Sequence, residues 1–205
     1  ELKTFVVGGF VRDCLLGKQK ESKDIDIVCN HSAIKLAKKT ADKLNIKDIV
    51  IYKNFGTALI KYKKLQIEFI SARKEYYNSS SRKPDIVLGT MEDDQQRRDF
   101  TINAMSISLN KNSFGNLIDP FSGQEDLKNK IIKTPLDPNK TFSDDPLRMF
   151  RAIRFSNQLD FKIENKTLTA IKDNRERVKI LSKERILEEF EKILVCKKPS
   201  NGLKL

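Results

Sequence analysis

Apolar residues recur with two different periods along the chain. In the first half, short runs of apolar and β-branched residues are interrupted by Gly, Lys and Asn, a pattern that is typical of strands. This pattern predicts strands over residues 4–8, 23–29, 48–52, 57–62, 65–71 and 106–109. Ser32 has the position of an N-cap for a helix over residues 33–44, which carries one apolar face. The first half is therefore expected to be a mixed domain built on a sheet.

Beyond Pro135 and Pro138 the apolar spacing becomes wholly helical. It predicts helices over residues 144–159, 166–174 and 182–195. The last of these is expected to bury Ile186, Leu187, Phe190, Ile193 and Leu194. We place a domain boundary here, with a head domain at residues 1–137 and a helical neck at residues 138–205. Because the sequence has no initiator Met and no natural stopping point, we expect it to be part of a longer protein.

Two carboxylates lie on one face of a predicted strand. Asp24 and Asp26 are separated by Ile25, and side chains of a strand alternate between its faces. Carboxylates about 7 Å apart repel each other unless a cation lies between them. Their oxygens suit Mg²⁺, which water and substrate phosphates complete. A strand with one solvated face would contain the same residues, so the pair indicates a metal site only together with the rest of the chain.

Glu68 lies in the predicted strand over residues 65–71, on the face that it shares with Gln66 and Ile70. It is either a third carboxylate beside the metal pair or a residue that faces solvent.

A Gly-Gly pair follows the first predicted strand. Gly8 and Gly9 lead into a helical run over residues 10–16, and such a turn lets backbone amides approach a phosphate. Arg12 adds a cation suited to a triphosphate. Asp13 is expected to pair with a nearby Arg or a backbone group. Tight turns use Gly routinely, so the pair alone is weak evidence for a phosphate site.

Two polar segments lie between the strands and the helical half. Residues 73–84 are rich in Ser and basic residues and are expected to form a mobile loop, either a lid or a plain connection. Thr90 has the position of a helix cap, with acids in the following turn. Arg97, Arg98 and Asp99 then run into an apolar helix, so these charges either pair with one another or face a ligand.

The overall composition narrows the function classes. The net charge of +12 suggests a polyanionic partner such as nucleic acid, although a solvated Lys-rich surface would give the same value. No apolar run approaches the ~20 residues of a membrane span, so we expect no membrane partner. Three widely spaced cysteines argue against a disulfide framework or a zinc site and favour a reducing, cytoplasmic setting. His31 is the only histidine, which makes a catalytic triad or a His-rich metal site hard to build.

Five ordered blocks of residues carry a resemblance to a known family. They are Gly8-Gly9-Phe10-Val11-Arg12-Asp13 with Asp24-Ile25-Asp26; Arg97-Arg98-Asp99-Phe100-Thr101-Ile102-Asn103-Ala104; Asp119-Pro120-Phe121-Ser122-Gly123; Asp144-Asp145-Pro146-Leu147-Arg148; and Glu184-Arg185-Ile186-Leu187-Glu188-Glu189. In this order the sequence resembles the class II tRNA nucleotidyltransferases, or CCA-adding enzymes, and the related bacterial poly(A) polymerases. These families belong to the DNA polymerase β-like nucleotidyltransferase superfamily. Nearly the whole chain is covered, with one departure, since the family commonly has Glu at the position of Asp144.

The resemblance implies an α+β fold. It consists of a polymerase β-like nucleotidyltransferase head, with a small mixed, mostly antiparallel sheet and flanking helices, followed by an all-α neck. The resemblance also implies further tRNA-binding helical domains after the neck, before which this sequence would be truncated. By role, the implied site residues are Asp24 and Asp26 for the Mg²⁺ ions and the chemistry; Gly8, Gly9 and Arg12 for the triphosphate, with Arg98 nearby and Asp99 at the ribose; Asp145 and Arg148 for the base, continued by Arg151 and Arg154; and Arg185 and Glu189 as structural support.

Hydrogen-bond chemistry lets the base-reading role be checked. Asp145 and Arg148, three positions apart on one predicted helix, would lie about 60° apart around its axis and reach one plane. A carboxylate only accepts hydrogen bonds and a guanidinium only donates them. Cytosine and adenine present an amino donor beside a ring-nitrogen acceptor, whereas uracil and guanine present a carbonyl beside an N–H. The pair should therefore accept CTP and ATP and reject UTP and GTP, without a template.

Two further expectations concern this helix. Arg148, Arg151 and Arg154 recur every three residues, which would also fit a solvated helix face with scattered Arg. If the resemblance holds, the carboxylate pair and the base-reading pair must face each other across the junction of head and neck.

The sequence thus predicts an enzyme that adds C, C and A to the 3′ end of tRNA from CTP and ATP. The reaction would be a Mg²⁺-dependent attack of the 3′-hydroxyl on the α-phosphate, and no protein partner is indicated. Poly(A) polymerase activity and CC-only or A-only addition are alternatives, because these enzymes share the head. From another class, the chain could be an inactive nucleotide- or RNA-binding module. The presence of Asp24, Asp26, Asp145 and Arg148 argues against that alternative.

Overall fold

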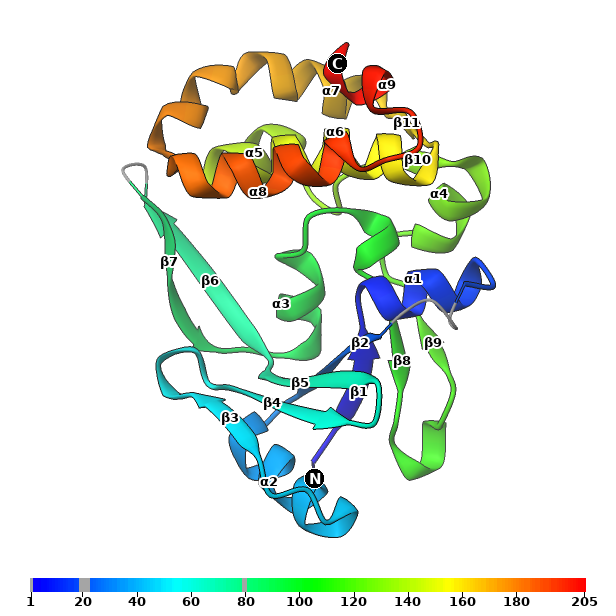
Figure 1. Cartoon of the computed structure of the whole chain (residues 1–205), viewed down its shortest axis with the longest axis vertical. Helices are drawn as coiled ribbons and strands as arrows, with labels where there is room; N and C mark the ends of the chain where they lie inside the picture. The colour runs from blue at the N-terminus through cyan, green and yellow to red at the C-terminus, as the bar shows by residue number, and fades with distance from the viewer. Residues whose placement is uncertain (1, 19–22, 79–80) are drawn as a thin grey trace. The chain divides into compact units, whose positions relative to one another are not determined.

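The computed structural model describes residues 2–18, 23–78 and 81–205, and it divides the chain into two units (Figure 1). Unit 1 comprises Glu1–Lys74, Val87–Gln95 and Asn103–Pro120. Unit 2 comprises Glu75–Ile86, Gln96–Ile102 and Phe121–Leu205. The two units therefore interleave along the sequence. The boundary near residue 137 stays a prediction.

A seven-stranded sheet forms the body of unit 1, in the order β3-β4-β5-β2-β1-β8-β9. Its strands are β1 (Thr4–Val7), β2 (Asp24–Cys29), β3 (Ile49–Tyr52), β4 (Thr57–Tyr62), β5 (Leu65–Ser71), β8 (Ser106–Ser108) and β9 (Leu117–Ile118). Neighbouring strands are antiparallel except β2 and β5, which are parallel. The predicted mixed, mostly antiparallel sheet is confirmed, and β9 is an addition that the sequence pattern did not indicate.

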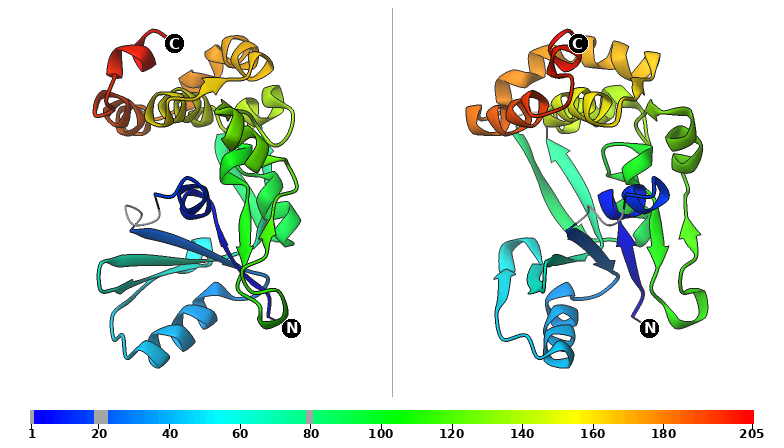
Figure 2. Two further views of the ribbon diagram at one scale, coloured as in Figure 1. Left: turned by 90° about the vertical axis from the view of Figure 1, so that its right-hand side faces the viewer. Right: turned by 45° about the vertical axis from the view of Figure 1, so that its right-hand side comes forward.

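One face of this sheet is covered by α2 (Ala33–Leu44), as Figure 2 shows. The predicted cap is present, since Ser32 Oγ accepts a hydrogen bond from Lys35 N. Ala37 and Ala41 are fully buried and let the helix pack closely on strand residues such as Phe69. Because side chains alternate along a strand, the apolar set faces α2 and the remaining set lies on the opposite face.

Two shorter helices of unit 1 follow strands. They are α1 (Gly9–Leu15), directly after β1, and α3 (Met91–Gln96), whose last residue belongs to unit 2. Thr90 and Asp93 cap α3 reciprocally: Thr90 Oγ1 accepts from Asp93 N at 3.1 Å, and Asp93 Oδ2 accepts from Thr90 N at 2.9 Å. This start was predicted. The apolar helix expected after Asp99 is instead a single 3₁₀ turn, η2 (Thr101–Asn103).

The mobile loop predicted over residues 73–84 is wrong for the described residues. β6 (Arg73–Asn78) and β7 (Ser81–Leu88) form a separate two-stranded sheet, in which each strand begins in one unit and ends in the other. Glu75 and Tyr77 are half-buried, whereas Lys74 and Tyr76 are exposed. This alternation, with two adjacent Tyr residues, is a strand pattern that the Ser-rich composition obscured.

Helices make up most of unit 2. They are α4 (Gly123–Asn129), α5 (Pro138–Asp144), α6 (Leu147–Leu159), α7 (Asn165–Asp173), α8 (Lys183–Leu194) and α9 (Pro199–Leu203). The short strands β10 (Ile131–Ile132) and β11 (Lys162–Ile163) pair in parallel, so the predicted all-α neck holds apart from β11. Further 3₁₀ turns are η1 (Lys53–Phe55) and η3 (Lys111–Ser113) in unit 1 and η4 (Arg175–Ile180) in unit 2. Among the described residues, no helix has the length and apolar character needed to cross a membrane.

The helix predicted over residues 144–159 corresponds to α6 and starts three residues later than predicted. α5 ends at Asp144, Asp145 has an extended backbone (φ −136°, ψ 97°), and α6 begins at Leu147. The cause is Pro146, because the ring of a proline disfavours helical backbone at the residue before it. Asp145 and Arg148 therefore do not share one helix.

The expected buried face of α8 is also partly wrong. Ile193 is buried, but Leu187, Phe190 and Leu194 are 55%, 39% and 45% exposed. The face that packs against α6 carries buried Glu189 instead, because Glu189 is paired with an arginine of α6. An ion pair, rather than the apolar stripe alone, sets the rotation of this helix.

Gly89 directly follows β7 and lies against the start of β6. A Cβ at this position would meet Lys74 N at 2.7 Å and the Arg73 carbonyl carbon at 2.8 Å. We expect Gly89→Ala to lower the free energy of unfolding by about 1–3 kcal/mol, because two backbone segments must separate. Gly9→Ala is the control, since its Cβ would meet only the Arg12 guanidinium, at ordinary contact distances of 3.5 Å or more. Urea unfolding measures both variants, and a Gly89→Ala variant as stable as the Gly9→Ala variant would contradict this packing.

Candidate functional site

A pocket of about 330 Å³ opens on the sheet face that α2 does not cover. Its lining residues are Asp24, Asp26, Tyr52, Leu59, Gln66 and Glu68. Both carboxylates predicted from the sequence lie in this pocket. Of the two alternatives for Glu68, the structure supports the one that puts it beside them.

The register of two parallel strands brings these acids together. Asp24 of β2 is opposite Gln66 of β5, and Asp26 is opposite Glu68. Burial raises the pKa of Glu68, the charge of Asp26 raises it further, and Arg73 opposes this with a positive charge. Partly buried carboxylates that face each other across a strand pair make a negatively charged site, as expected for a site that attracts cations.

The donor set fits a divalent cation of the hard type. The pocket offers only oxygen and amide groups as polar ligands, and carboxylate oxygens are the ligands that Mg²⁺ prefers. Within the described residues, no cluster of three or more His, Cys, Asp or Glu side chains could enclose a metal ion. A cation at Asp24 and Asp26 would therefore have few protein ligands and would need water and substrate phosphates to complete its shell.

The turn after β1 holds Gly8, Gly9 and Arg12. Gly8 has φ 75° and ψ −139°, a conformation that favours glycine, and it precedes α1 directly. Arg12 is buried, with Nε and Nη2 at 2.9 and 2.7 Å from Asp13 Oδ1 and Nη1 at 2.9 Å from Asn103 Oδ1. The internal partner role predicted for Asp13 is confirmed. The guanidinium is thus fixed beside Gly9, and its contact with a triphosphate stays a prediction.

In unit 2, β6 and the turn after α3 hold Arg148 of α6. Arg148 Nη2 donates to the Arg97 carbonyl at 2.6 Å and to Tyr77 Oη at 3.4 Å, and lies 3.9 Å from Glu75 Oε2. Glu75 also accepts from Tyr77 Oη at 2.7 Å and pairs with Arg97 at 3.2 Å. Burial raises the pKa of Tyr77 against the opposing charge of Arg148, and Glu75 adds to the rise. Tyr77 therefore stays protonated, and its hydroxyl donates to Glu75.

Asp145 interacts with the same cluster, but from a position before α6 and not from the helix as predicted. Its Oδ1 accepts a hydrogen bond from Leu147 N at 3.1 Å and so caps the start of α6. Its charge raises the pKa of both Tyr77 and Arg151. The expectation that Asp145 and Arg148 project from one helix is wrong, because Asp145 precedes the helix that carries Arg148.

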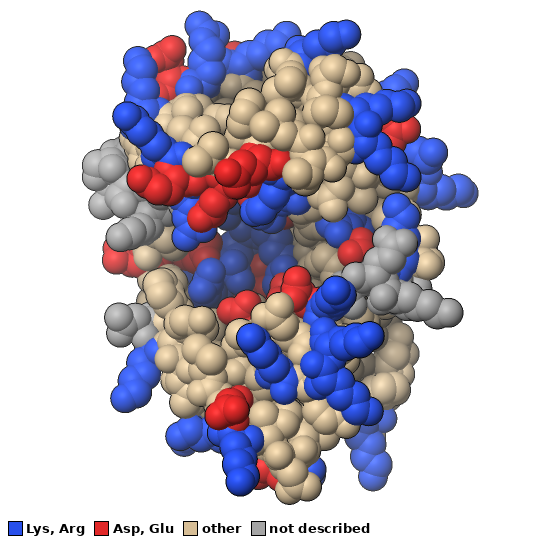
Figure 3. Space-filling view, in the orientation of Figure 1, with Lys and Arg blue, Asp and Glu red and all other residues tan. Residues whose placement is uncertain are grey.

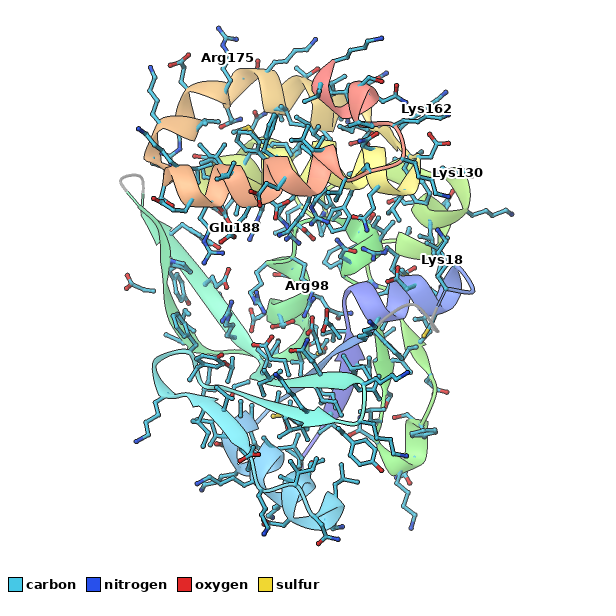
Figure 4. The ribbon with its side chains drawn as sticks, viewed as in Figure 1. Lys18, Arg98, Lys130, Lys162, Arg175 and Glu188 are labelled. Carbon is cyan, nitrogen blue, oxygen red and sulfur yellow. The ribbon has the colours of Figure 1, made fainter. Side chains whose placement is uncertain are left out.

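Asp99, predicted at a ribose, is paired inside unit 2. Its Oδ2 accepts from Arg151 Nε at 2.8 Å and Nη2 at 2.6 Å, while Oδ1 accepts from Phe100 N at 2.8 Å. Arg151 extends this network to Glu189, whose Oε1 lies 4.0 Å from its Nη1. The pKa of Arg151 is raised chiefly by Asp99. Arg98 is half-buried between Arg97 and Asp99 and is labelled in Figure 4.

Arg154, the last of the three arginines on α6, is held by contacts within unit 2. Arg154 Nε donates to Glu189 Oε2 at 2.6 Å, and its guanidinium lies 3.9 Å from the Phe155 ring centroid. Arg148 and Arg154 are each 9% exposed, so the alternative of a solvated Arg face is excluded. Glu189 contacts α6 as a supporting residue would. Arg185 differs from the bracing role predicted for it, because its side chain is 55% exposed and pairs with Glu188 on its own helix.

Sequence reasoning missed three site residues. Glu75 and Tyr77 fall in the segment taken for a loop, although their period-two spacing was the available signal. Tyr52 was recognised only as part of a strand, and no local pattern indicates that it lines the acidic pocket.

Neighbouring acids on α8 allow a controlled test of the buried network. Glu189→Ala leaves Arg154 without its partner in the interior and should cost about 3–5 kcal/mol of unfolding free energy. Glu188→Ala removes only an exposed pair with Arg185 and should cost about 0–1 kcal/mol. Urea unfolding of both variants measures the difference, and similar losses would contradict the network.

The same pair predicts a pH dependence. Burial alone would raise the pKa of Glu189, but Arg154, Lys192 and Arg151 together lower it. A carboxyl whose folded pKa lies below its unfolded value stabilises the protein above the unfolded value of about 4.3 and loses that contribution as pH falls through the folded value. The stability difference between the native chain and Glu189→Ala should therefore shrink below about pH 4.

Comparisons with known proteins agree with this architecture. The sequence model of the family described as "Poly A polymerase head domain" matches residues 4–133. That of the family described as "Probable RNA and SrmB- binding site of polymerase A" matches residues 160–205. Similar curated proteins include an A-adding tRNA nucleotidyltransferase of Aquifex aeolicus, 43% identical over 83% of this chain and 20% of that one. They also include a CCA-adding enzyme of Pediococcus pentosaceus, 41% identical over 97% of this chain and 48% of that one.

Solved structures are similar over 99% of the chain. A tRNA nucleotidyltransferase complexed with a primer tRNA and an incoming ATP analog has a TM-score of 0.86 at 36% identity, with 56% of that chain covered. An apo form of a CCA-adding enzyme has a TM-score of 0.89 at 40% identity, with 47% of that chain covered. The chain thus spans about half the length of these structures. With the family model matching most of its length, the chain belongs to the poly A polymerase head domain family, as its resemblance to class II tRNA nucleotidyltransferases and poly(A) polymerases predicted.

Proposed function

We propose that this chain is part of an RNA nucleotidyltransferase that adds C, C and A to the 3′ end of tRNA from CTP and ATP. The observation that carries the proposal is the pocket in which Asp24, Asp26 and Glu68 meet on one sheet face, in a chain of this family. A Mg²⁺ site of this kind supplies activation of the attacking 3′-hydroxyl and neutralisation of the leaving pyrophosphate. Asp24 and Asp26 would hold the metal, with Glu68 adding negative charge across the strand pair.

Phosphate binding falls to the turn at the end of β1. Gly8 and Gly9 leave the backbone without side chains at the start of α1, so a phosphate can approach the amides closely. The guanidinium of Arg12 is held by Asp13 and Asn103 before any ligand arrives. A cation that is already positioned stabilises developing phosphate charge without reorganisation during the reaction.

Base selection falls to Asp145 and Arg148. The hydrogen bonds of Arg148 to described residues all start from Nη2, which leaves Nε and Nη1 as donors for an acceptor nitrogen of cytosine or adenine. One oxygen of Asp145 caps α6, and its carboxylate would accept from the amino group of the same bases. The proposal that this cluster and the carboxylate pocket act on one nucleotide rests on the family resemblance.

Several features favour tRNA as the partner. The relatives include CCA-adding and A-adding enzymes, residues 160–205 match an RNA-binding model, and the net charge is +12. The three cysteines are free, in keeping with a cytoplasmic enzyme. A-adding or poly(A) activity is the second candidate, favoured by the relative that is 43% identical.

One assay separates these activities. The chain is incubated with Mg²⁺, a tRNA that ends before CCA, and labelled CTP, ATP, GTP or UTP, singly and together, and the product ends are sequenced. We expect CCA ends with all four nucleotides and no incorporation of GTP or UTP. Long A tails would indicate a poly(A) polymerase, and A addition only to tRNA that already ends in CC would indicate an A-adding enzyme. A chain that binds nucleotide without any incorporation would be a binding module.

Asp26→Asn tests the metal assignment. Incorporation should fall on the order of 10³-fold, because charge stabilisation worth several kcal/mol is lost. The melting temperature should stay the same or rise, since the charge that raises the pKa of Glu68 is gone. Asp42→Asn on the exposed side of α2 is the control and should retain activity. Wild-type turnover by Asp26→Asn would overturn the assignment.

Two substitutions at Asp145 separate capping from selection. Asp145→Asn can still cap α6 but presents an amide donor, so kcat/KM for CTP relative to UTP should fall by at least about 10-fold at nearly unchanged stability. Asp145→Ala should lose selection and also about 0.5–2 kcal/mol of stability. Asp137→Asn, at a carboxylate that caps α5 through Lys140 N, is the control for capping alone. Unaltered nucleotide preference in both Asp145 variants would show that this residue does not read the base.

A further inference from the structure

One side of the acidic pocket is an apolar wall that the proposed chemistry does not use. Tyr52, the last residue of β3, lines the pocket and is 47% exposed. Leu59 of β4 lines it too, and Val50, opposite Leu59 in the register, is 47% exposed. We call Val50, Tyr52 and Leu59 the apolar wall.

The register places this wall in line with the acids. Val50 is opposite Leu59, Leu59 is opposite Glu68, and Glu68 is opposite Asp26. These four residues form one row across the sheet, apolar at one end and acidic at the other. Tyr52 lies two residues beyond Val50 on the same strand, hence on the same face.

We propose that the apolar wall binds the nucleoside at the 3′ end of the RNA that is being extended, with its base against the ring of Tyr52. This inference rests on the proposed function. The argument starts from the reaction. In phosphoryl transfer the attacking and leaving oxygens lie roughly in line on opposite sides of the phosphorus. The 3′-hydroxyl must therefore reach the metal carboxylates from the side opposite the pyrophosphate.

The strand order of the sheet separates these two sides. β2, with Asp24 and Asp26, lies between β1 and β5. β1 leads into Gly8 and Gly9, proposed for the triphosphate, whereas β5, β4 and β3 lead to the apolar wall. If the pyrophosphate lies on the β1 side, the attacking hydroxyl comes from the side of Tyr52.

The chemistry of the wall suits a terminal nucleoside whose base changes as the RNA grows. Every base has a π-face, so stacking on an aromatic ring contributes about 1–3 kcal/mol per base with little regard to sequence. A set of hydrogen-bonding groups would accept some ends and leave buried groups unpaired with others. Tyr52 and its apolar neighbours avoid that discrimination.

Positive charge lies next to this wall. Lys61 is opposite Gln66, which is opposite Asp24, so it lies on the pocket face of the sheet. Lys63 and Lys64 form the turn between β4 and β5, and all three lysines are exposed. Figure 3 shows Lys and Arg side chains gathered over this part of unit 1. These cations match the phosphates that precede the 3′ end of an RNA.

The direct test is a binding measurement that needs no turnover. A tRNA acceptor-stem RNA ending before CCA carries 2-aminopurine as its 3′-terminal base, whose fluorescence is quenched when it stacks. We expect quenching by the native chain and by Tyr52→Phe. Tyr52→Leu and Tyr52→Ala should bind the RNA about 5- to 150-fold more weakly and lose the quenching. Tyr52→Leu retains apolar bulk in the strand, so it separates loss of stacking from loss of fold.

Steady-state kinetics then identify the ligand of the wall. The KM for RNA should rise in Tyr52→Ala and Tyr52→Leu while the KM for CTP stays unchanged. Tyr76→Ala, at an exposed tyrosine of β6 that does not line the pocket, is the control and should leave both KM values unchanged. A rise in the KM for CTP instead would assign the wall to the incoming nucleotide and overturn the proposal. Unchanged quenching and unchanged KM values in Tyr52→Leu would overturn it as well.

These outcomes are distinct from a failure of the proposed function. Asp26→Asn should still quench the 2-aminopurine signal although its incorporation falls on the order of 10³-fold. Absence of incorporation by the native chain would refute the proposed function, whereas incorporation unaffected by Tyr52→Leu would refute the apolar wall alone.

Discussion

The parallel pairing of β2 with β5 is the contact on which the site in unit 1 depends. It places Asp26 opposite Glu68 and gathers carboxylates on one face, where burial and then the charge of Asp26 raise the pKa of Glu68. Parallel neighbours cannot be joined by a tight turn and need a crossover connection. Here α2, β3 and β4 form that connection, so the segment that makes the pairing possible also supplies the helix that covers the opposite face and the strands that carry the apolar wall.

The cluster in unit 2 depends on a different feature, the hydrogen bonds and ion pairs that hold three arginines of α6 in place. Arg148, Arg151 and Arg154 come from one helix, but their main partners differ. Arg148 is held by β6 and the turn after α3, Arg151 by Asp99 of the same turn, and Arg154 by Glu189 of α8. Buried ion pairs contribute little net stability, because desolvation offsets their attraction. Their value here lies in geometry, since a guanidinium anchored through one or two of its nitrogens keeps its remaining donors pointed in a fixed direction.

The sequence was most informative where structure depends on local spacing. Strand alternation located β2 to β5 within about one residue, and the Ser32 cap located α2, because period and capping are properties of neighbouring residues. The helix break at Asp145 was also readable from Pro146, and the strand character of Glu75 and Tyr77 from their alternation. In both cases a broader pattern, apolar spacing or Ser-rich composition, outweighed the local rule.

Other features could not be read from any local window. The buried face of α8 depends on Glu189 meeting Arg154 from another helix, and an isolated glutamate in an amphipathic pattern looks like a surface residue. The position of Tyr52 in the acidic pocket depends on the registers of three strand pairs in succession. These contacts are set by the tertiary structure. Asp24 and Asp26, in contrast, could be identified from the sequence because one strand suffices to bring them together.

The two kinds of recognition proposed here follow from what each ligand must satisfy. An enzyme that builds a fixed sequence without a template must reject wrong incoming bases, which requires buried donors and acceptors that a wrong base leaves unpaired. The end that it extends changes with each addition, so the same selectivity there would stop the reaction after one step. Charged groups from Asp145 and Arg148 suit the first task, and an aromatic and aliphatic surface at Tyr52 and Leu59 suits the second. With selective groups in unit 2 and a tolerant surface in unit 1, the two proposed sites would let the enzyme reject wrong incoming bases and still accept each new RNA end.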